Sequence, residues 1–446
     1  MMSDTFSISV KDWLGPGRGG SAEEATVAEI SINAGNYCAT QVEDFVSKTV
    51  RSTIRVSAEP FAKWLLANWW RLKCETEPIH AEVSHDWSMA HSVSAIGNGY
   101  VWPHLLFVGS DSEQIRVRCE QRITSADEKL TPVRFLNSFE TTIAVSHFES
   151  GVRSFIETVL ARLRASGILK GDLHDLWDDL NAEWSNTKYA SHRKLEALLG
   201  LDPDQDDALV SSALKWGTQF GSNALEEIAA ALNSGEIAEA LKQAKSLALK
   251  TKTFADINGA KTLAADNDTS SNNAPWQRAQ AMAYALRKKW EFDDSPISDE
   301  KLADRLGLDV SKLRETRPDA PFSFGVRGRG SDKLGFLLNR PHVEGRRFDT
   351  ARLIGDFIAF DRDEKIIPAT NAITTRQQFQ RAFAAEFLCP SEMIRKLYSN
   401  MDQRSIVKAI DEISNQYEVS ERIVQHHMVN RQVLSHAMFE SSLLLA

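Results

Sequence analysis

Cysteine is scarce in this chain, and its cysteines are too far apart to form a motif. The four of them, Cys38, Cys74, Cys119 and Cys389, show no C-x-x-C spacing. A disulfide framework or a thiolate zinc site uses cysteines at short, paired spacings. We therefore predict neither, and we expect the reducing environment of the cytoplasm.

Long apolar segments are missing as well. A membrane-spanning helix needs about 18 or more consecutive apolar residues, and no run in this sequence approaches that length. The first residues, MMSDTFSISV, lack the basic and apolar regions of a signal peptide. The sequence predicts a protein with no membrane partner.

Positive charge is in deficit, with a formal net charge of −9, and the imbalance is uneven. Residues 170–246 contain 14 acidic and 7 basic side chains, whereas residues 314–352 contain nine basic and five acidic ones. The overall negative charge argues against general affinity for nucleic acid. Five arginines of the basic stretch leave room for a local anion site: Arg327, Arg329, Arg340, Arg346 and Arg347.

At 446 residues the chain is long enough for two or three domains, each with its own core. We predict an α+β multidomain protein without internal repeats. Its expected parts are a mixed α/β domain at residues 1–165, an acidic all-helical region at 166–250, a linker at 251–275 and a mainly helical module at 276–446.

Apolar patterns place the main elements of the first domain. Alternation of apolar and polar residues predicts strands at residues 6–10, 26–32 and 115–119. One helix is expected after Ser57, a residue type that caps helices. A second is expected to begin at Ser146, because Ser146 and Glu149 form a capping-box pattern.

The rest of the chain favours helices. An alanine-rich run at residues 225–249 has high helix propensity, and residues 251–275 are polar and turn-rich, as expected of a linker. Farther on, residues 276–290 and 297–307 predict helices, and residues 334–338 predict a buried strand.

Two motifs stand out near the end of the chain. Residues 346–357 read RRFDTARLIGDF, and residues 376–390 read RQQFQRAFAAEFLCP. Together they resemble the core of the ImmA/IrrE family of bacterial zinc metallopeptidases. In that family a helix with the pattern RF-x-x-A-HE-x-x-H precedes a second helix that ends roughly in AN-x-FAA-x-LL-x-P. The resemblance covers residues 276–446 and implies a zincin-like module.

The metal-binding residues of the family pattern are replaced in this chain. In place of HE-x-x-H it has Arg352-Leu353-Ile354-Gly355-Asp356. A catalytic zinc needs three protein ligands and a water that the glutamate of the motif deprotonates, and arginine has no free lone pair. The family's third ligand, a glutamate shortly before FAA, gives way to Gln377-Gln378-Phe379. Glu386 is expected on the helix surface. We predict no metal and no cofactor.

The resemblance therefore implies a catalytically silent relative of these peptidases. Family members often control repressors, mobile elements or stress responses, which implies a bacterial regulatory or phage-defence protein that binds a protein partner or an anionic ligand. The altered pocket is expected to contain seven residues: Arg347, Arg352, Asp356, Arg376, Gln377, Gln380 and Arg381.

Arg352 and Asp356 lie one helical turn apart, which leaves two interpretations. They pair with each other in a closed pocket, where the cation replaces the charge of the metal or captures an anion. Alternatively, they are unrelated surface charges.

Two enzymatic alternatives stay open. Asp356 offers one carboxylate to a hydrolase with new partners. Asp111 and Glu120 resemble the carboxylate pair that holds Mg²⁺ in a restriction-type nuclease, although Arg122 replaces the usual lysine. The strand that carries Glu120 also fits a plain exposed sheet edge.

A DNA-binding regulator is the third hypothesis. Residues 406–433 predict two helices separated by Tyr417–Ser420, and duplex DNA is a candidate partner of this pair. Residues 298–314 fit either a helix-turn-helix or the opening helix of the peptidase-like module.

Two further patterns carry little weight. Residues 15–20, GPGRGG, match the letters of a dinucleotide fingerprint, but a strand is expected after them where the fingerprint needs a helix. His80, His85, His91 and His104 have a spacing that fits no zinc signature, so we expect structural histidines.

Overall fold

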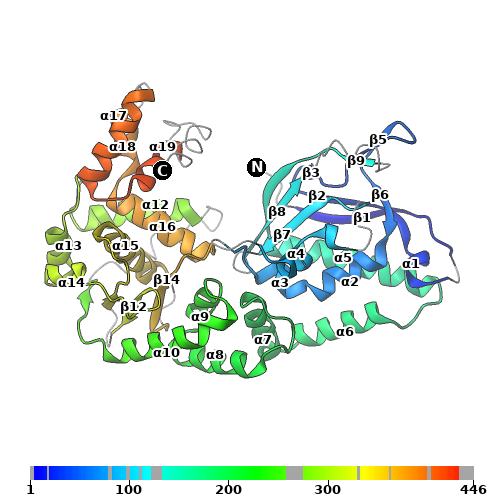
Figure 1. Cartoon of the computed structure of the whole chain (residues 1–446), viewed down its shortest axis with the longest axis horizontal. Coiled ribbons are helices and arrows are strands. Elements are labelled where there is room, and N and C mark those ends of the chain that lie inside the picture. The colour runs from blue at the N-terminus through cyan, green and yellow to red at the C-terminus, as the bar shows by residue number, and fades with distance from the viewer. Residues whose placement is uncertain are drawn as a thin grey trace. The chain divides into compact units, whose positions relative to one another are not determined.

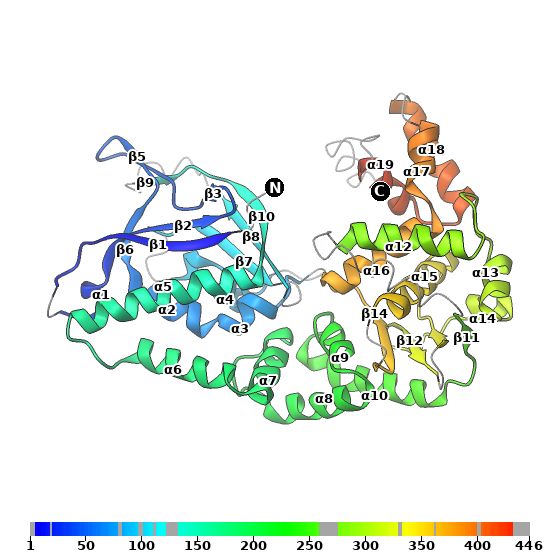
Figure 2. The ribbon, with the colours of Figure 1, turned by 180° about the vertical axis from the view of Figure 1, so that it is seen from behind.

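The computed structural model of the chain describes residues 5–17, 20–78, 83–96, 101–109, 113–121, 133–257, 275–328, 332–360, 363–398 and 403–430. Figures 1 and 2 show it from opposite sides. The chain forms two compact units, Met1–Val210 and Ser211–Ala446. The predicted α+β multidomain class is confirmed. The predicted acidic region, residues 166–250, is shared between the two units.

The first unit consists of short strands followed by helices. Its elements are β1 Phe6–Trp13, α1 Ala22–Ala25, β2 Val27–Ala34, β3 Tyr37–Cys38, β4 Val42–Asp44, β5 Thr49–Arg51, β6 Ile54–Ser57, α2 Ala58–Ala67, α3 Trp69–Cys74, α4 His85–His91, β7 His104–Gly109, β8 Gln114–Glu120, β9 Val133–Phe135, β10 Phe139–Ala144, α5 Val145–Ala165, α6 Asp172–Trp184 and α7 Thr187–Leu198. Helix α8, Asp207–Phe220, contains the boundary between the units.

Antiparallel sheets supply the strand core of this unit. The orders are β1-β2-β3 with β6 on β2, β10-β8-β7, and β5-β4-β9. Residues of β2 alternate between buried and half-buried, as the sequence predicts for a strand with one face on a core. Helix α5 packs against β1 and buries its apolar stripe, which includes Phe148, Phe155 and Leu163.

Three local predictions for this unit are wrong. Strand β8 is the centre of its sheet, bonded to both β10 and β7, so it is not an exposed edge. Helix α5 begins at Val145 without a side-chain cap, because the chain enters it directly from β10. Ser57 precedes α2 as predicted, but its hydroxyl donates to the carbonyl oxygen of Glu23 instead of capping the helix.

The second unit is mainly helical with one four-stranded sheet. Its elements are α9 Ser222–Ala229, α10 Ser234–Lys250, β11 Ala255–Asp256, α12 Pro275–Lys289, α13 Asp299–Leu306, α14 Val310–Arg314, β12 Ser323–Arg327, β13 Lys333–Leu337, α15 Val343–Ala359, β14 Ile366–Ala369, α16 Thr375–Leu388, α17 Ser391–Tyr398, α18 Gln403–Tyr417 and α19 Glu421–Asn430.

The antiparallel sheet of this unit has the order β11-β13-β12-β14, and α15 contacts its last three strands. Helix α16 packs on both α15 and α12, and Figure 2 shows these three helices side by side. The predicted linker contributes β11, which pairs with β13; residues 258–274 of that linker lie outside the described part. Within the described residues, no helix combines the length and the apolar character needed to cross a bilayer.

Candidate functional site

The part of helix α15 that carries Arg352 and Asp356 is buried on all sides. Every residue from Ala351 to Ile358 is buried. Gly355 permits this packing, because a Cβ atom there would lie 2.5 Å from the ring of Phe383 on α16. Arg352 is 2% exposed and Asp356 is fully buried. The interpretation of these two residues as unrelated surface charges is therefore wrong.

Asp356 is held by α16 rather than by its neighbour on α15. The guanidinium of Arg376 donates to both of its carboxylate oxygens, with Nε–Oδ2 2.6 Å and Nη2–Oδ1 2.7 Å. Gln380 Nε2 donates a further bond to Oδ2 at 2.7 Å. Such bidentate arginine–carboxylate contacts are among the strongest polar interactions in proteins. Both oxygens of the carboxylate are therefore occupied by donors.

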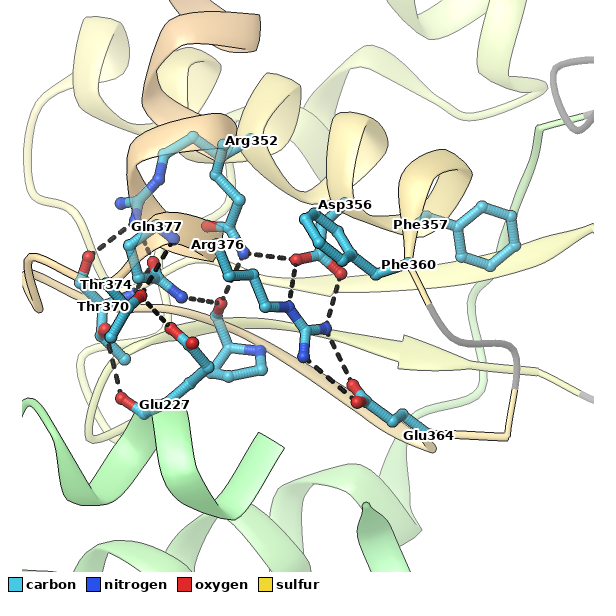
Figure 3. A network of polar contacts seen from close by, with 12 residues as sticks. Glu227, Arg352, Asp356, Phe357, Phe360, Glu364, Thr370, Thr374, Arg376 and Gln377 are labelled. Carbon is cyan, nitrogen blue, oxygen red and sulfur yellow. Dashed lines mark hydrogen bonds and ion pairs between the residues drawn. The ribbon is translucent and has the colours of Figure 1, made fainter. Parts of the chain in front are cut away.

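The same guanidinium also binds a second buried carboxylate. Arg376 donates to Glu364, with Nη1–Oε1 3.1 Å and Nη2–Oε2 2.8 Å, and Figure 3 shows it between the two acids. Burial alone would lower the pKa of Arg376, but the charges of Asp356 and Glu364 outweigh burial and hold that pKa well above its ordinary value. One cation therefore joins α15, α16 and the segment that precedes β14.

Arg352 forms a second cluster beside the first. Its Nη1 donates to Asp349 at 3.0 Å, and its Nη2 donates to the carbonyl oxygen of Thr370 at 2.6 Å and to Gln377 Oε1 at 2.5 Å. Burial lowers the pKa of Arg352, and the charge of Asp349 opposes that shift. The predicted direct pairing of Arg352 with Asp356 is wrong, because each finds its partner elsewhere.

Gln377 and Gln380 fix the geometry between the two clusters. Both donate from Nε2 to the carbonyl oxygen of Pro368 in β14, at 3.1 and 3.0 Å. Gln377 also accepts from the backbone N–H of Thr370 at 3.0 Å. Both side chains are fully buried. The two glutamines therefore link α16 to the sheet as well as to α15.

Glu227 enters the same region from α9. Thr374 Oγ1, at the N-terminal cap of α16, donates to Glu227 Oε2 at 2.7 Å, as Figure 3 shows. Burial raises the pKa of Glu227 to about 7, and the nearby charge of Arg376 opposes that rise. Sequence reasoning missed both Glu227 and Glu364. A buried carboxylate has no local signature when it lies among many exposed acidic residues, as Glu227 does.

Five of the seven predicted pocket residues are bonded together here. Arg381 lies beside them, close enough for its charge to interact with those of Arg352 and Glu227, and Arg347 lies elsewhere. Arg347 bonds to Asp299 of α13 and to the carbonyl oxygen of Ile297 at 2.6 Å. Arg381 donates to the carbonyl oxygen of Ala372 at 3.0 Å. Glu386 is buried and accepts a bond from the backbone N–H of Ser391, so its predicted place on the helix surface is wrong.

These donors do not fit a zinc ion. Zinc requires three deprotonated ligand atoms and an open position for water, but here the central groups are two guanidiniums and two amides. Asp356 is the one carboxylate among residues 352–356, and both of its oxygens already accept from Arg376. Leu353, where the family pattern would have its glutamate, is a fully buried core residue.

The candidate nuclease and histidine clusters lie in the first unit. Glu120 is exposed at the end of β8, 3.4 Å from Arg118 Nε, and Asp111 lies outside the described residues. His91 is fully buried, with Nδ1 2.7 Å from the carbonyl oxygen of Phe107 and Nε2 3.0 Å from Glu75. These contacts give His91 a structural role. His85 and His104 occupy α4 and β7, and His80 lies outside the described part.

One cluster in the first unit has the ligand types of a metal site. His192, Glu196 and Asp207 bring one donor atom each within 4.8 Å of one another. Glu196 is already occupied, because Arg193 Nη1 donates to its Oε2 at 2.9 Å and the N–H of Asp204 donates to its Oε1 at 2.7 Å. We interpret the cluster as part of a surface ion-pair network.

The two candidate DNA-binding segments are helical. In residues 298–314, α13 and the five-residue α14 are separated by Gly307, which adopts a left-handed conformation with φ 63°. Asp299 of α13 is paired with Arg314 and Arg347, which ties this segment to α15. The predicted C-terminal pair corresponds to α18 and α19, and residues 431–433 lie outside the described part.

Comparison of the chain with protein-family models, with curated proteins and with solved structures found no match.

Proposed function

We propose that residues 276–446 form a zincin-like module related to the ImmA/IrrE peptidases, in which an internal ion-pair network has replaced the zinc site. The protein would then be a bacterial regulatory or defence-related protein that acts by binding a protein partner or an anionic ligand. One observation carries this proposal. Arg352, Asp356 and Gln377 meet between α15 and α16, at the positions where the family pattern has its ligands.

The helix arrangement supports the family frame. The RF-x-x-A part of the pattern lies on α15 and the FAA part on α16, and these two helices pack against each other. Phe383 of the FAA sequence contacts Gly355, the residue before Asp356. Two short motifs that are separate in the sequence therefore belong to one packed centre.

The chemistry of this centre argues against peptidase catalysis. A peptidase of this type needs a polarised water and a general base, and the side chains here are buried and bonded to one another. Arg352, Asp356, Gln377 and Gln380 are each at most 2% exposed. An anionic ligand is also excluded from their interior, because Asp349, Asp356 and Glu364 already neutralise the two cations. The nuclease and DNA-binding alternatives stay hypotheses.

An activity assay tests the proposal against its enzymatic alternatives. The full-length protein is incubated with unfolded casein and with duplex DNA, each in the presence of zinc, manganese or magnesium. We expect no cleavage of either substrate. Chelator-sensitive proteolysis would contradict the proposal, and DNA cleavage that disappears in Glu120→Ala would support the nuclease instead.

A further inference from the structure

An open pocket of about 700 Å³ lies at one end of the sheet of the second unit, where β12 ends and β13 and β14 begin. The end of α10 and the segment that follows it complete its wall. The lining residues are Phe220, Ala248, Leu249, Thr251, Lys252, Phe254, Val326, Arg327, Gly328, Lys333 and Lys365. The volume is typical of sites for drug-sized ligands and cofactors.

The polar part of this lining is strongly cationic. It contains Lys252, Arg327, Lys333 and Lys365, and no acidic residue. Lys333 is paired with Asp256 at 2.9 Å, outside the lining. Lys252 and Lys365 are exposed, and neither has a carboxylate partner among the described residues. The pocket therefore concentrates positive charge in a protein whose net charge is −9.

Arg327 is fixed in place at the pocket wall. Its guanidinium lies 4.3 Å from the ring centre of Phe357, and its Nη1 and Nη2 donate long bonds to the carbonyl oxygens of Phe357 and Phe360, at 3.4 and 3.5 Å. Stacking on an aromatic face holds a guanidinium flat and orients its N–H groups. A planar cation in this position suits a phosphate group.

Backbone hydrogen bonds connect the lining residues and make the pocket rigid. The N–H of Lys365 donates to the carbonyl of Phe220, the N–H of Arg327 donates to the carbonyl of Lys365, and the N–H of Gly328 donates to the carbonyl of Lys333, each at 2.9 Å. The backbones of Arg327, Lys333 and Lys365 are thus held on strands or next to a strand end, whereas Lys252 follows α10. A backbone that is already fixed loses little conformational entropy when a ligand binds.

The remaining wall is apolar and includes an aromatic ring. Phe254 is half-buried, and its close approach to the sheet depends on glycine, because a Cβ atom on Gly328 would lie 2.9 Å from its ring. Leu249 is 73% exposed and lies beside it in the lining. A ligand with a flat apolar body would bury these surfaces.

We propose that this pocket binds a nucleotide, with its phosphates at Lys252, Lys365 and Arg327 and its base against Phe254 and Leu249. A phosphate monoester carries a charge of about −1.5 to −2 at neutral pH. A lining with four cations and no acidic residue accommodates two linked phosphates, as in a nucleoside diphosphate. The limited volume of the pocket and the negative net charge of the chain favour a small anion over a nucleic acid.

The pocket adjoins the buried network without belonging to it. Arg327 contacts the end of α15, and Lys365 follows Glu364, the partner of Arg376. A nucleotide would be the anionic ligand of the proposed function, and the regulatory role of this binding rests on that proposed function. Affinity for a nucleotide is measurable whether or not the peptidase resemblance is correct.

Calorimetric titration of the full-length protein with ADP tests the inference. We expect one ADP per chain and weaker binding at higher potassium chloride concentration. The double variant Lys252→Ala/Lys365→Ala should lose about tenfold or more in affinity, because a hydrogen bond to a charged group contributes about 1.5–3 kcal/mol. The matched control is Lys215→Ala/Lys288→Ala, which removes two exposed lysines that lie outside the pocket lining and should bind ADP as the wild type does.

Pyrophosphate and a short DNA duplex complete the experiment. Pyrophosphate lacks the base and should bind more weakly than ADP, and the duplex should not compete with ADP. The inference is overturned if ADP gives no binding heat, if both double variants lose affinity equally, if pyrophosphate binds as tightly as ADP, or if the duplex displaces ADP. None of these outcomes bears on the proposed role of the network between α15 and α16. Conversely, peptidase activity would contradict that proposed role but would not affect the evidence for ADP binding.

Discussion

The buried network between α15 and α16 and the open pocket at the end of the sheet are both rich in cations, but they satisfy charge in opposite ways. In the network, Arg352 and Arg376 are 2% and 7% exposed, and Asp349, Asp356 and Glu364 are bonded to them. In the pocket, Lys252 and Lys365 are exposed and have no carboxylate partner among the described residues.

This difference separates a structural role from a binding role. Removing one member of a buried ion pair destabilises the surrounding helices, because the other charge is left buried without compensation. A cation that is exposed and lacks a partner contributes little to folding and keeps its capacity for an external anion. The family resemblance predicts a binding site at the network, whereas the distribution of exposed cations indicates one at the pocket.

Removal of Arg376 from the buried network should cause the largest loss of stability. Arg376→Met keeps most of the side-chain volume but leaves Asp356 and Glu364 without their shared cation. Loss of one partner from a buried ion pair costs about 3–5 kcal/mol, so we expect destabilisation of that size in urea unfolding of the full-length protein.

Lys365→Ala is the matched control for Arg376→Met. Lys365 is an exposed cation that directly follows Glu364, and surface substitutions of this kind usually change stability by less than about 0.5 kcal/mol. Equal stability losses in the two variants would show that the buried cations of the network contribute no more to stability than the exposed cations of the pocket.

The buried carboxyl group of Glu227 should make the stability of the protein depend on pH. Its folded pKa of about 7 lies above its ordinary value of 4.5, so the folded protein keeps a proton that the unfolded chain releases. The stability that this site supplies is therefore present at low pH and lost as pH rises from about 4.5 to 7. Glu227→Gln retains a hydrogen-bond acceptor for Thr374 but cannot ionise.

The variant should therefore resemble the wild type near pH 5 and be more stable than it near pH 8. A pKa displacement of this size corresponds to a difference on the order of 3 kcal/mol. Unfolding free energies measured at both pH values check the prediction. A variant that is equally destabilised at both would mean that Glu227 is ionised in the folded protein.

Much of the fold was predictable from local sequence patterns. The apolar stripe of α5, the alternation in β1, β2 and β8, and the helices α12 and α13 all correspond to predicted segments. The errors concern features that depend on distant chain segments. The neighbours of β8 come from residues 104–109 and 139–144, and its own sequence does not reveal whether it is central or at an edge.

The candidate site shows the same limit. The family resemblance predicted one group of seven residues, and the structure bonds five of them together: Arg352, Asp356, Arg376, Gln377 and Gln380. The pairing within the group was predicted wrongly. Helical spacing suggested that Arg352 pairs with Asp356, but α16 supplies Gln377 to Arg352 and Arg376 to Asp356. The basic pocket combines Lys252, Arg327 and Lys365 from three distant segments, and of these only Arg327 lay in the predicted basic stretch.

The metal content of the protein after purification without chelators shows directly whether the network between α15 and α16 stands in place of a zinc site. The account predicts that elemental analysis of the full-length protein finds no stoichiometric zinc or manganese, and that EDTA leaves its thermal unfolding unchanged. One zinc per chain, released by EDTA together with a fall in thermal stability and absent from Asp356→Ala, would contradict the proposed replacement of a metal site by the network around Arg376.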